Sequence, residues 1–211
     1  MTTAISPTMR SSLPPNFEPA WDLVTLFPSQ GDWRESDYHD LTSRTNRLIE
    51  LVEGRIEFVP MPTMKHQLIA HFFCSLLMAL KAGFAVPAAF KLRLRKDLIR
   101  EPDVVFLLRE NASHVSDEYW EKADLVLEVV SPDDPKRDYV DKRKEYAEAG
   151  IREYWIVDPK KQAVFVLELA NGAYAEHGPF GRGDIAASVL LTPLRIPVDD
   201  LFAAGEPDAA G

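Results

Sequence analysis

The sequence predicts an α/β fold in which a central mixed sheet is flanked by helices. Three observations support this class: one long apolar run at helical spacing, several short apolar runs typical of strands, and helices that alternate with groups of strands. The chain has 211 residues, 46% of them hydrophobic, which suits one domain with a sizeable core. We expect this domain to span residues 21–205, after a disordered arm at 1–20 and before a frayed tail at 206–211.

The first half of the domain is expected to contain two helices and a hairpin. Residues 40–50 carry aliphatic side chains at helical spacing, and residues 51–60, LVEGRIEFVP, predict a turn at the glycine with strand beside it. Residues 64–82 form the clearest helix, with Thr63 as a suitable N-cap and Gly83 as a suitable stop.

The second half is expected to be mostly strands. A single helix interrupts them, for which Asp134 suits the N-cap, Pro135 the first helical position and Gly150 the left-handed C-terminal position. The sequence DPKK at 158–161 predicts a hairpin turn. The expected strands lie at 90–95, 101–108, 124–130, 154–157, 163–169 and 188–191.

Two carboxylates lie in apolar strands. Asp103 opens the run DVVFLL, and Glu128 lies inside LVLEVV. A buried carboxylate costs several kcal/mol unless it is paired or binds a cation. The two strands are close in sequence and could be neighbours about 4.8 Å apart, where the acids could share Mg²⁺ or Mn²⁺. Each acid alone could equally face water or pair with a base on the next strand.

The helix after Glu128 has three polar residues on one face. Asp138, Lys142 and Tyr146 are spaced four apart. Asp138 and Lys142 could simply form a helical ion pair, contributing about 0.3 kcal/mol, with Tyr146 as a packing residue. Alternatively, Lys142 could return to the acids and stabilise negative charge on a phosphoryl group.

Three further polar residues are weaker candidates for the same site. His66 and Gln67 begin the long helix, and Glu50 precedes the glycine turn at the end of the first expected helix. Each of these residue types is common on an ordinary solvated surface. One of the acids around the turn could reach the site if the first helix packs against the sheet.

The charge balance limits the classes of partner. The formal net charge of −9 argues against a protein that coats nucleic acid, but not against an enzyme with a local basic groove. Lys91, Arg93 and Arg95 alternate along one strand, where they could contact phosphates or simply solvate an edge strand. No membrane span or signal peptide is visible, so we expect a cytoplasmic protein.

Several sequence pieces together resemble the Uma-type restriction endonuclease family, a branch of the PD-(D/E)XK nuclease superfamily. The resemblance covers residues 40–202. It rests on IELVEGRIEFVPMP, KHQ, EPDVVFL, DLVLEVVSP, DYVDKRKEYAEAGIREYWIVDP and PVDDLF. It implies a restriction-endonuclease-like core, a mixed sheet with helices on both sides.

The resemblance also assigns site residues. It matches Asp103 to the aspartate of the PD element and Glu128 to the second acid, both as metal ligands. The lysine that usually stands two residues after the second acid is replaced by Val130, and Lys142 matches a lysine supplied by the following helix. Glu50 matches the acid near the end of the first helix. Asp138 and Tyr146 are expected to be scaffold.

The implied activity is Mg²⁺-dependent hydrolysis of DNA phosphodiesters. Two alternatives remain open at this stage: a binding or scaffold protein that keeps the nuclease fold without turnover, and a hydrolase of a small phosphodiester. The sequence does not distinguish DNA from RNA and names no target site. A homodimer is compatible with the sequence, because cutting two strands requires two sites.

Overall fold

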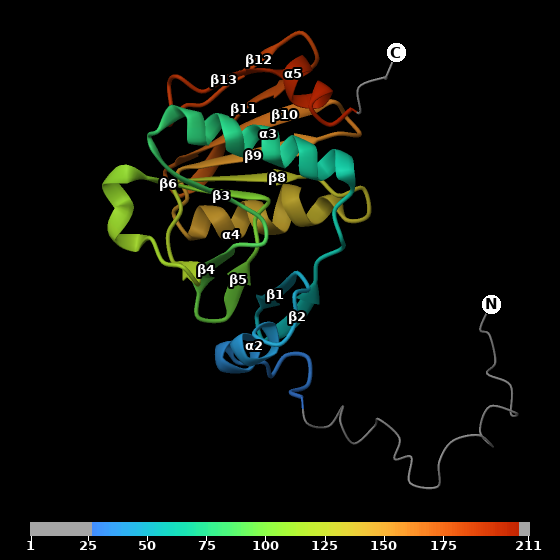
Figure 1. Ribbon diagram of the computed structural model, residues 1–211, viewed down its shortest axis with the longest axis vertical. Coiled ribbons are helices and arrows are strands. Elements are labelled where there is room, and N and C mark those ends of the chain that lie inside the picture. The colour runs from blue at the N-terminus through green and yellow to red at the C-terminus, as the bar shows by residue number, and fades with distance from the viewer. Residues whose placement is uncertain (1–26, 207–211) are drawn as a thin grey trace, which may run out of the picture.

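The computed structural model describes residues 27–206. The expected arm at 1–20 and the last five residues of the tail lie outside the described residues. A six-stranded sheet, a five-stranded sheet, a two-stranded sheet and their helices confirm the mixed α/β class, and Figure 1 shows the five-stranded sheet below the six-stranded one. Among residues 27–206, no helix is long and apolar enough to cross a bilayer.

The larger sheet has six strands in the order β11-β10-β9-β8-β6-β3. Its central strand β8 is antiparallel to β6 and parallel to β9, so the sheet is mixed. The strands are β3 (Gly83–Pro87), β6 (Val104–Leu108), β8 (Leu125–Val129), β9 (Glu153–Asp158), β10 (Ala163–Ala170) and β11 (Ala173–Phe180).

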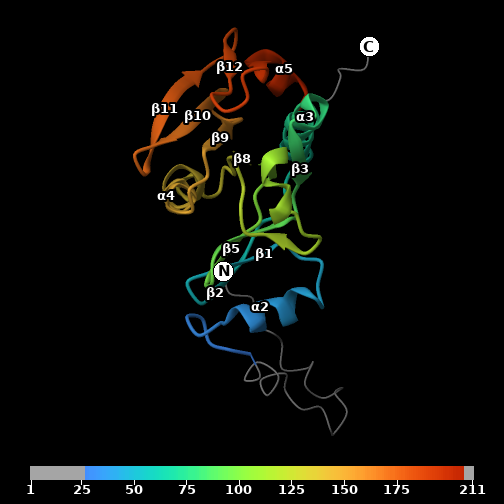
Figure 2. The same cartoon turned by 90° about the vertical axis from the view of Figure 1, so that its left-hand side faces the viewer.

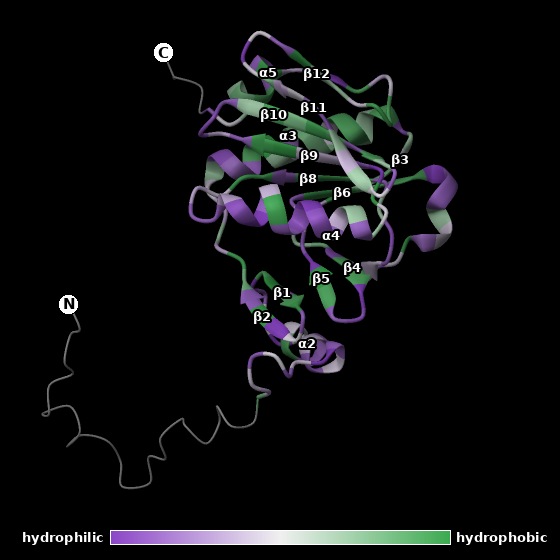
Figure 3. Ribbon diagram, turned by 180° about the vertical axis from the view of Figure 1, so that it is seen from behind, coloured by the Kyte–Doolittle hydropathy of each residue, from purple (hydrophilic) through white to green (hydrophobic). Residues whose placement is uncertain are grey.

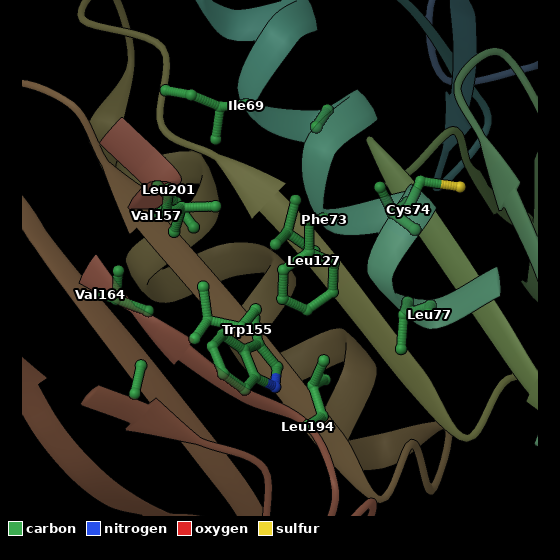
Figure 4. Close-up of a cluster of buried hydrophobic side chains, with 14 of the residues drawn as sticks. Ile69, Phe73, Cys74, Leu77, Leu127, Trp155, Val157, Val164, Leu194 and Leu201 are labelled. Carbon is green, nitrogen blue, oxygen red and sulfur yellow. The ribbon is translucent and has the colours of Figure 1, made fainter. Parts of the chain in front are cut away.

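Helices cover both faces of this sheet. The helices α3 (Met64–Leu80) and α5 (Val198–Ala203) lie on one face and α4 (Lys142–Glu148) on the other, as the edge-on view of Figure 2 shows. On the α3 side, Phe73 packs against Trp155, with ring centroids 5.0 Å apart (Figure 4). On the other side, Figure 3 shows hydrophobic strands behind α4.

The smaller sheet has five strands in the order β2-β1-β5-β4-β7. They are β1 (Ile49–Val52), β2 (Arg55–Phe58), β4 (Lys91–Arg95), β5 (Leu98–Arg100) and β7 (Tyr119–Trp120). Helix α2 (Glu35–Thr42) packs on this sheet, where Tyr38 joins the apolar residues of β1, β2 and β5 in a third core. The hairpin at Gly54 is confirmed, with Glu53 and Gly54 both at positive φ, as a tight hairpin turn requires.

The helix after β8 has an irregular start. It begins at Pro135, passes through a π-helical turn at Arg137–Asp141 and continues as α4. Gly150 takes the expected left-handed conformation, with φ of 76°. The N-cap of α3 is also confirmed, because the Thr63 side chain accepts a hydrogen bond from the His66 amide. The left-handed residue after α3 is Lys81, however, and Gly83 opens β3 instead.

Two of the predicted helix and strand segments were wrong. Residues 40–50 are not one helix: α2 ends at Thr42, and the following strand β1 bonds to a strand on each side, which holds its backbone extended. Residues 188–191 are not a strand, because they lie between β12 (Ile185–Ala187) and β13 (Arg195–Pro197). There the amides of Val189 and Leu190 donate to Glu153 instead of a sheet partner.

Candidate active site

Asp103 directly precedes β6, and Glu128 lies on β8, the strand that pairs with β6, so the two strands are neighbours as the sequence predicted. Val104 at the start of β6 pairs with Leu127 of β8, so the same antiparallel register places Asp103 beside Glu128. Side chains alternate along β8: Leu127 and its alternate neighbours enter the core under α3, whereas Glu128 contacts α4. The two acids therefore meet at the end of the strand pair.

Asp103 is held in a fixed orientation through one of its oxygens. Its Oδ2 accepts a hydrogen bond from the Val129 amide at 2.7 Å and lies 3.1 Å from Nε2 of His66. Within residues 27–206, its Oδ1 has no hydrogen-bond donor. The carboxylate thus has one oxygen anchored by the protein and one open to a ligand.

Glu128 is bonded in the same one-sided way. Its Oε1 accepts a hydrogen bond from the Tyr146 hydroxyl at 2.6 Å and lies 2.8 Å from Nζ of Lys142. Its Oε2 has no donor within the described residues. Burial raises the pKa of Glu128, Lys142 lowers it, and the nearby Asp103 and Asp138 raise it again, leaving it at about 8. Its donors do not fully offset the cost of burying this charge.

Lys142 is the cation of this cluster. It follows directly on the π-helical turn and is buried, with Nζ also 3.4 Å from Oδ1 of Asp138. Burial lowers the pKa of Lys142, but the charges of Glu128 and Asp138 outweigh burial and hold its pKa above the ordinary value. The ammonium is therefore charged at neutral pH. Val130, at the usual lysine position, is buried in the core beside Tyr146.

Glu50 is bonded through both of its oxygens. Oε2 contacts Nη1 of Arg100 at 2.6 Å and also Nη2 of Arg137, while Oε1 accepts the amide of Glu101 at 3.0 Å. Burial alone would raise the pKa of Glu50. The positive charges of Lys142, Arg100 and Arg137 outweigh burial and lower its pKa to about 2. Glu50 lies on β1, not at the end of a helix as the sequence suggested.

The supporting candidates are placed differently from one another. Tyr146 and Asp138 belong to the buried cluster around Lys142 and Glu128. His66 contacts Asp103, and its buried Nδ1 has no partner within the described residues. Burial alone would lower the pKa of His66, but its hydrogen bond with Asp103 and the nearby negative charges raise it. Gln67 is exposed.

The basic residues of β4 are engaged within the protein. Lys91 donates to Thr42, Arg93 pairs with Glu35 and Glu121, and Arg95 pairs with Glu53 and Asp97. The interpretation of these residues as a solvated edge strand was wrong, because β4 lies between β5 and β7. Contacts of this row with phosphates stay a prediction.

Comparison with known families gives a clear match. The family model Uma2, described as "Putative restriction endonuclease", matches residues 35–199, which is well over half of the chain. The chain belongs to the Uma2 family. A crystal structure described as a putative nuclease belonging to DUF820, from Anabaena variabilis ATCC 29413, superposes with a TM-score of 0.63. At 19% identity it covers 77% of this chain and 93% of its own, which shows a shared fold. None of the curated proteins matches.

This Uma2 chain offers a small set of metal donors. Within the described part of the chain, no group of three or more His, Cys, Asp or Glu side chains is arranged to hold a metal ion. The available set is the open oxygens of Asp103 and Glu128. A site of two carboxylates with water in the remaining positions is the kind that Mg²⁺ accepts, since it keeps several of its waters.

Sequence reasoning missed the arginines that surround Glu50. Arg100 is almost fully buried, and Arg137 lies on the π-helical turn of the Uma2 domain. The available signal was Arg100 at the end of an apolar strand, since a buried arginine requires carboxylate partners. The partners themselves come from β1, β2 and α4, which the sequence does not place near one another.

Proposed function

We propose that this Uma2 protein is a Mg²⁺- or Mn²⁺-dependent nuclease that hydrolyses DNA phosphodiesters with a metal-activated water. One observation carries the proposal: Glu128 is buried beside Asp103, its Oε1 is bonded to Lys142 and Tyr146, and its Oε2 has no donor within the described residues. The match to a family described as restriction endonucleases supports a nuclease, and DNA is the substrate such a family would cut.

The two carboxylates fit a divalent cation by their electrostatics. Burial raises the pKa of Glu128 most, and repulsion from Asp103 and Asp138 raises it further; a bound cation would relieve that repulsion. Asp103 and Glu128 would hold the ion. When bound, Mg²⁺ or Mn²⁺ supplies a water of lowered pKa and polarises the phosphate.

The protein's own groups would orient the reaction. His66 and the Val129 amide hold Asp103, and Tyr146 holds Glu128, so both open oxygens point in set directions. Lys142 places a positive charge within 2.8 Å of Glu128, where it can stabilise charge developing on a phosphoryl oxygen. Asp138 shares this ammonium and keeps it charged.

Supercoiled plasmid cleavage tests the proposal directly. The wild-type chain is incubated with plasmid and Mg²⁺ or Mn²⁺, alongside Asp103→Asn and the control Asp117→Asn, which changes an exposed aspartate. We expect nicked or linear DNA from the wild type and the control only, and none after addition of EDTA. Cleavage that survives in Asp103→Asn would contradict the proposed site.

A parallel assay separates the alternative functions. The same proteins are given a small aryl phosphodiester, and their Mn²⁺ binding is followed by calorimetry. Hydrolysis of the small ester without DNA cleavage would favour a small-phosphodiester hydrolase. Absence of turnover on either substrate, with Mn²⁺ heat unchanged in Asp103→Asn, would favour a scaffold that retains only the nuclease fold.

A further inference from the structure

The helix that carries Lys142 is fastened to the smaller sheet by a buried arginine. Arg100 ends β5, and its side chain is only 3% exposed. Its Nε and Nη2 donate to the two oxygens of Glu145 on α4, at 2.8 and 2.7 Å. A two-pronged bond of this kind fixes direction as well as distance. Glu145 is three residues beyond Lys142, so the bond holds the helix just after the lysine.

A second contact holds the same helix just before the lysine. Arg137, on the π-helical turn, bonds to Glu50 on β1 through Nη2. Arg100 reaches the same oxygen of Glu50 through Nη1 at 2.6 Å. The two arginines thus meet on one carboxylate, and the smaller sheet, which lies below α4 in Figure 1, holds the helix on both sides of Lys142.

The position of the lysine makes these contacts important. A lysine at position 130 would be fixed by the pairing of β8 with its neighbours, but that position is Val130. Lys142 instead follows a π-helical turn, which interrupts the regular helical ladder of hydrogen bonds. Its placement on Glu128 therefore depends on where the helix lies. A displacement of about 1 Å in a reacting group can cost about 100-fold in rate.

We infer that Arg100 is a positioning residue, which with Glu50 and Glu145 fixes α4 so that Lys142 stays on Glu128. The inference rests on the proposed nuclease function. Glu50 would then anchor the helix, because both of its oxygens are already bonded to Arg100, Arg137 and a backbone amide.

The test exchanges arginine for lysine at two positions. Arg100→Lys keeps the charge beside Glu50 but loses the two-pronged bond to Glu145. Arg182→Lys is the matched control, because Arg182 also pairs with two acids, Asp199 and Glu206, in the C-terminal segment. DNA cleavage is measured over a range of Mn²⁺ concentrations, at a temperature where circular dichroism shows that every variant is folded. If Arg100→Lys does not fold, Glu145→Gln replaces it.

If Arg100 is a positioning residue, its replacement should lower turnover without changing the affinity for metal. In Arg100→Lys, kcat falls about tenfold while the Mn²⁺ concentration for half-maximal rate stays within about twofold. Arg182→Lys changes neither value. An unchanged kcat in Arg100→Lys would overturn the inference. A rise in the Mn²⁺ concentration for half-maximal rate that accounts for the lost rate would also overturn it, because Arg100 and Glu50 would then act on the metal site.

Hydrogen exchange tests the contact between Arg100 and α4 without requiring nuclease activity. If the wild-type chain cuts neither DNA nor a small phosphodiester, the proposed function fails, but the positioning contact can still be measured. Amides of α4 are expected to exchange faster in Arg100→Lys than in Arg182→Lys. The exchange rates of amides in the six-stranded sheet should be the same in both variants. Equal exchange over α4 in the two variants would overturn the contact itself.

Discussion

Two buried glutamates from the candidate site have opposite electrostatic environments. Glu50 accepts from two arginines and one amide through both oxygens, and its pKa falls to about 2. Glu128 accepts from Tyr146 and Lys142 through one oxygen, and burial together with two neighbouring acids raises its pKa to about 8. Burial therefore does not distinguish scaffold from site in this molecule. The number and placement of the donors do.

The largest expected effect is loss of activity at Glu128. Glu128→Gln keeps the size of the side chain but removes the charge that would hold the cation, so kcat should fall about 1000-fold. Stability should change by no more than about 1 kcal/mol, because the lost ion pair is offset by removal of a poorly compensated buried charge. Plasmid cleavage and urea unfolding measure the two quantities.

A matched control for Glu128→Gln is Glu168→Gln. Glu168 is half-exposed on β10 and pairs with His177, so neither activity nor stability should change measurably. If Glu128→Gln instead unfolds the protein while the control does not, Glu128 is a structural anchor and the contrast with Glu50 disappears.

The contrast predicts the reverse result at Glu50. Glu50→Gln leaves two buried guanidinium groups without their shared charge, so the free energy of unfolding should fall by about 3 kcal/mol. Half-exposed Glu57 touches the same Arg100 at 3.2 Å, and Glu57→Gln should cost less than about 1 kcal/mol. Urea unfolding of both variants gives the comparison. Similar small losses in both would show that the buried pair is not an anchor.

A smaller loss of kcat is expected from replacing Lys142, and Lys144 on the same helix provides the control. Lys142→Met should lower kcat about 100-fold, since it removes a charge placed to stabilise the transition state. Lys144→Met changes a lysine that is 77% exposed and pairs with Glu148, so kcat should stay at the wild-type value. Single-turnover cleavage of DNA measures both. Equal rates in the two variants would remove Lys142 from the proposed mechanism.

The sequence was sufficient to predict the features that depend on local pattern. The α3 helix, the glycine hairpin and the β6 and β8 strands all follow from apolar periodicity and turn residues. The exposed strand β11 was missed because most of its residues face solvent and show no apolar alternation. The segment 40–50 was misread because three aliphatic residues at helical spacing mimic a helix, whereas pairing with β5 makes part of it a strand.

The candidate site could be predicted only in part, because some of its contacts join residues that are far apart in the sequence. Asp103 and Glu128 stand out because acids in apolar strands are rare, and their strands adjoin. The environment of Glu50 depends on Arg100 and Arg137, which are 50 and 87 residues away in the chain. No local pattern encodes such contacts, so only the tertiary structure separates an anchored acid from an open one.

The last prediction concerns the pH dependence of stability in EDTA. The pKa of Glu50 is lowered, so the stability it contributes is present above pH 4.5 and is lost as the pH falls toward 2. The pKa of Glu128 is raised, so its contribution is greatest below pH 4.5 and is lost as the pH rises toward 8. Each group changes the free energy of unfolding by at most about 1.4 kcal/mol per pH unit.

Urea unfolding from pH 3 to pH 9 can separate these two contributions. Glu50→Gln should flatten the acidic side of the stability profile, below pH 4.5. Glu128→Gln should flatten the decline between pH 4.5 and 8 and leave the acidic side unchanged. If both variants flatten the same side, the two glutamates share one electrostatic environment, and the distinction between an anchored and an open carboxylate is wrong. If each flattens its own side, the opposite pKa shifts are properties of two separate sets of donors.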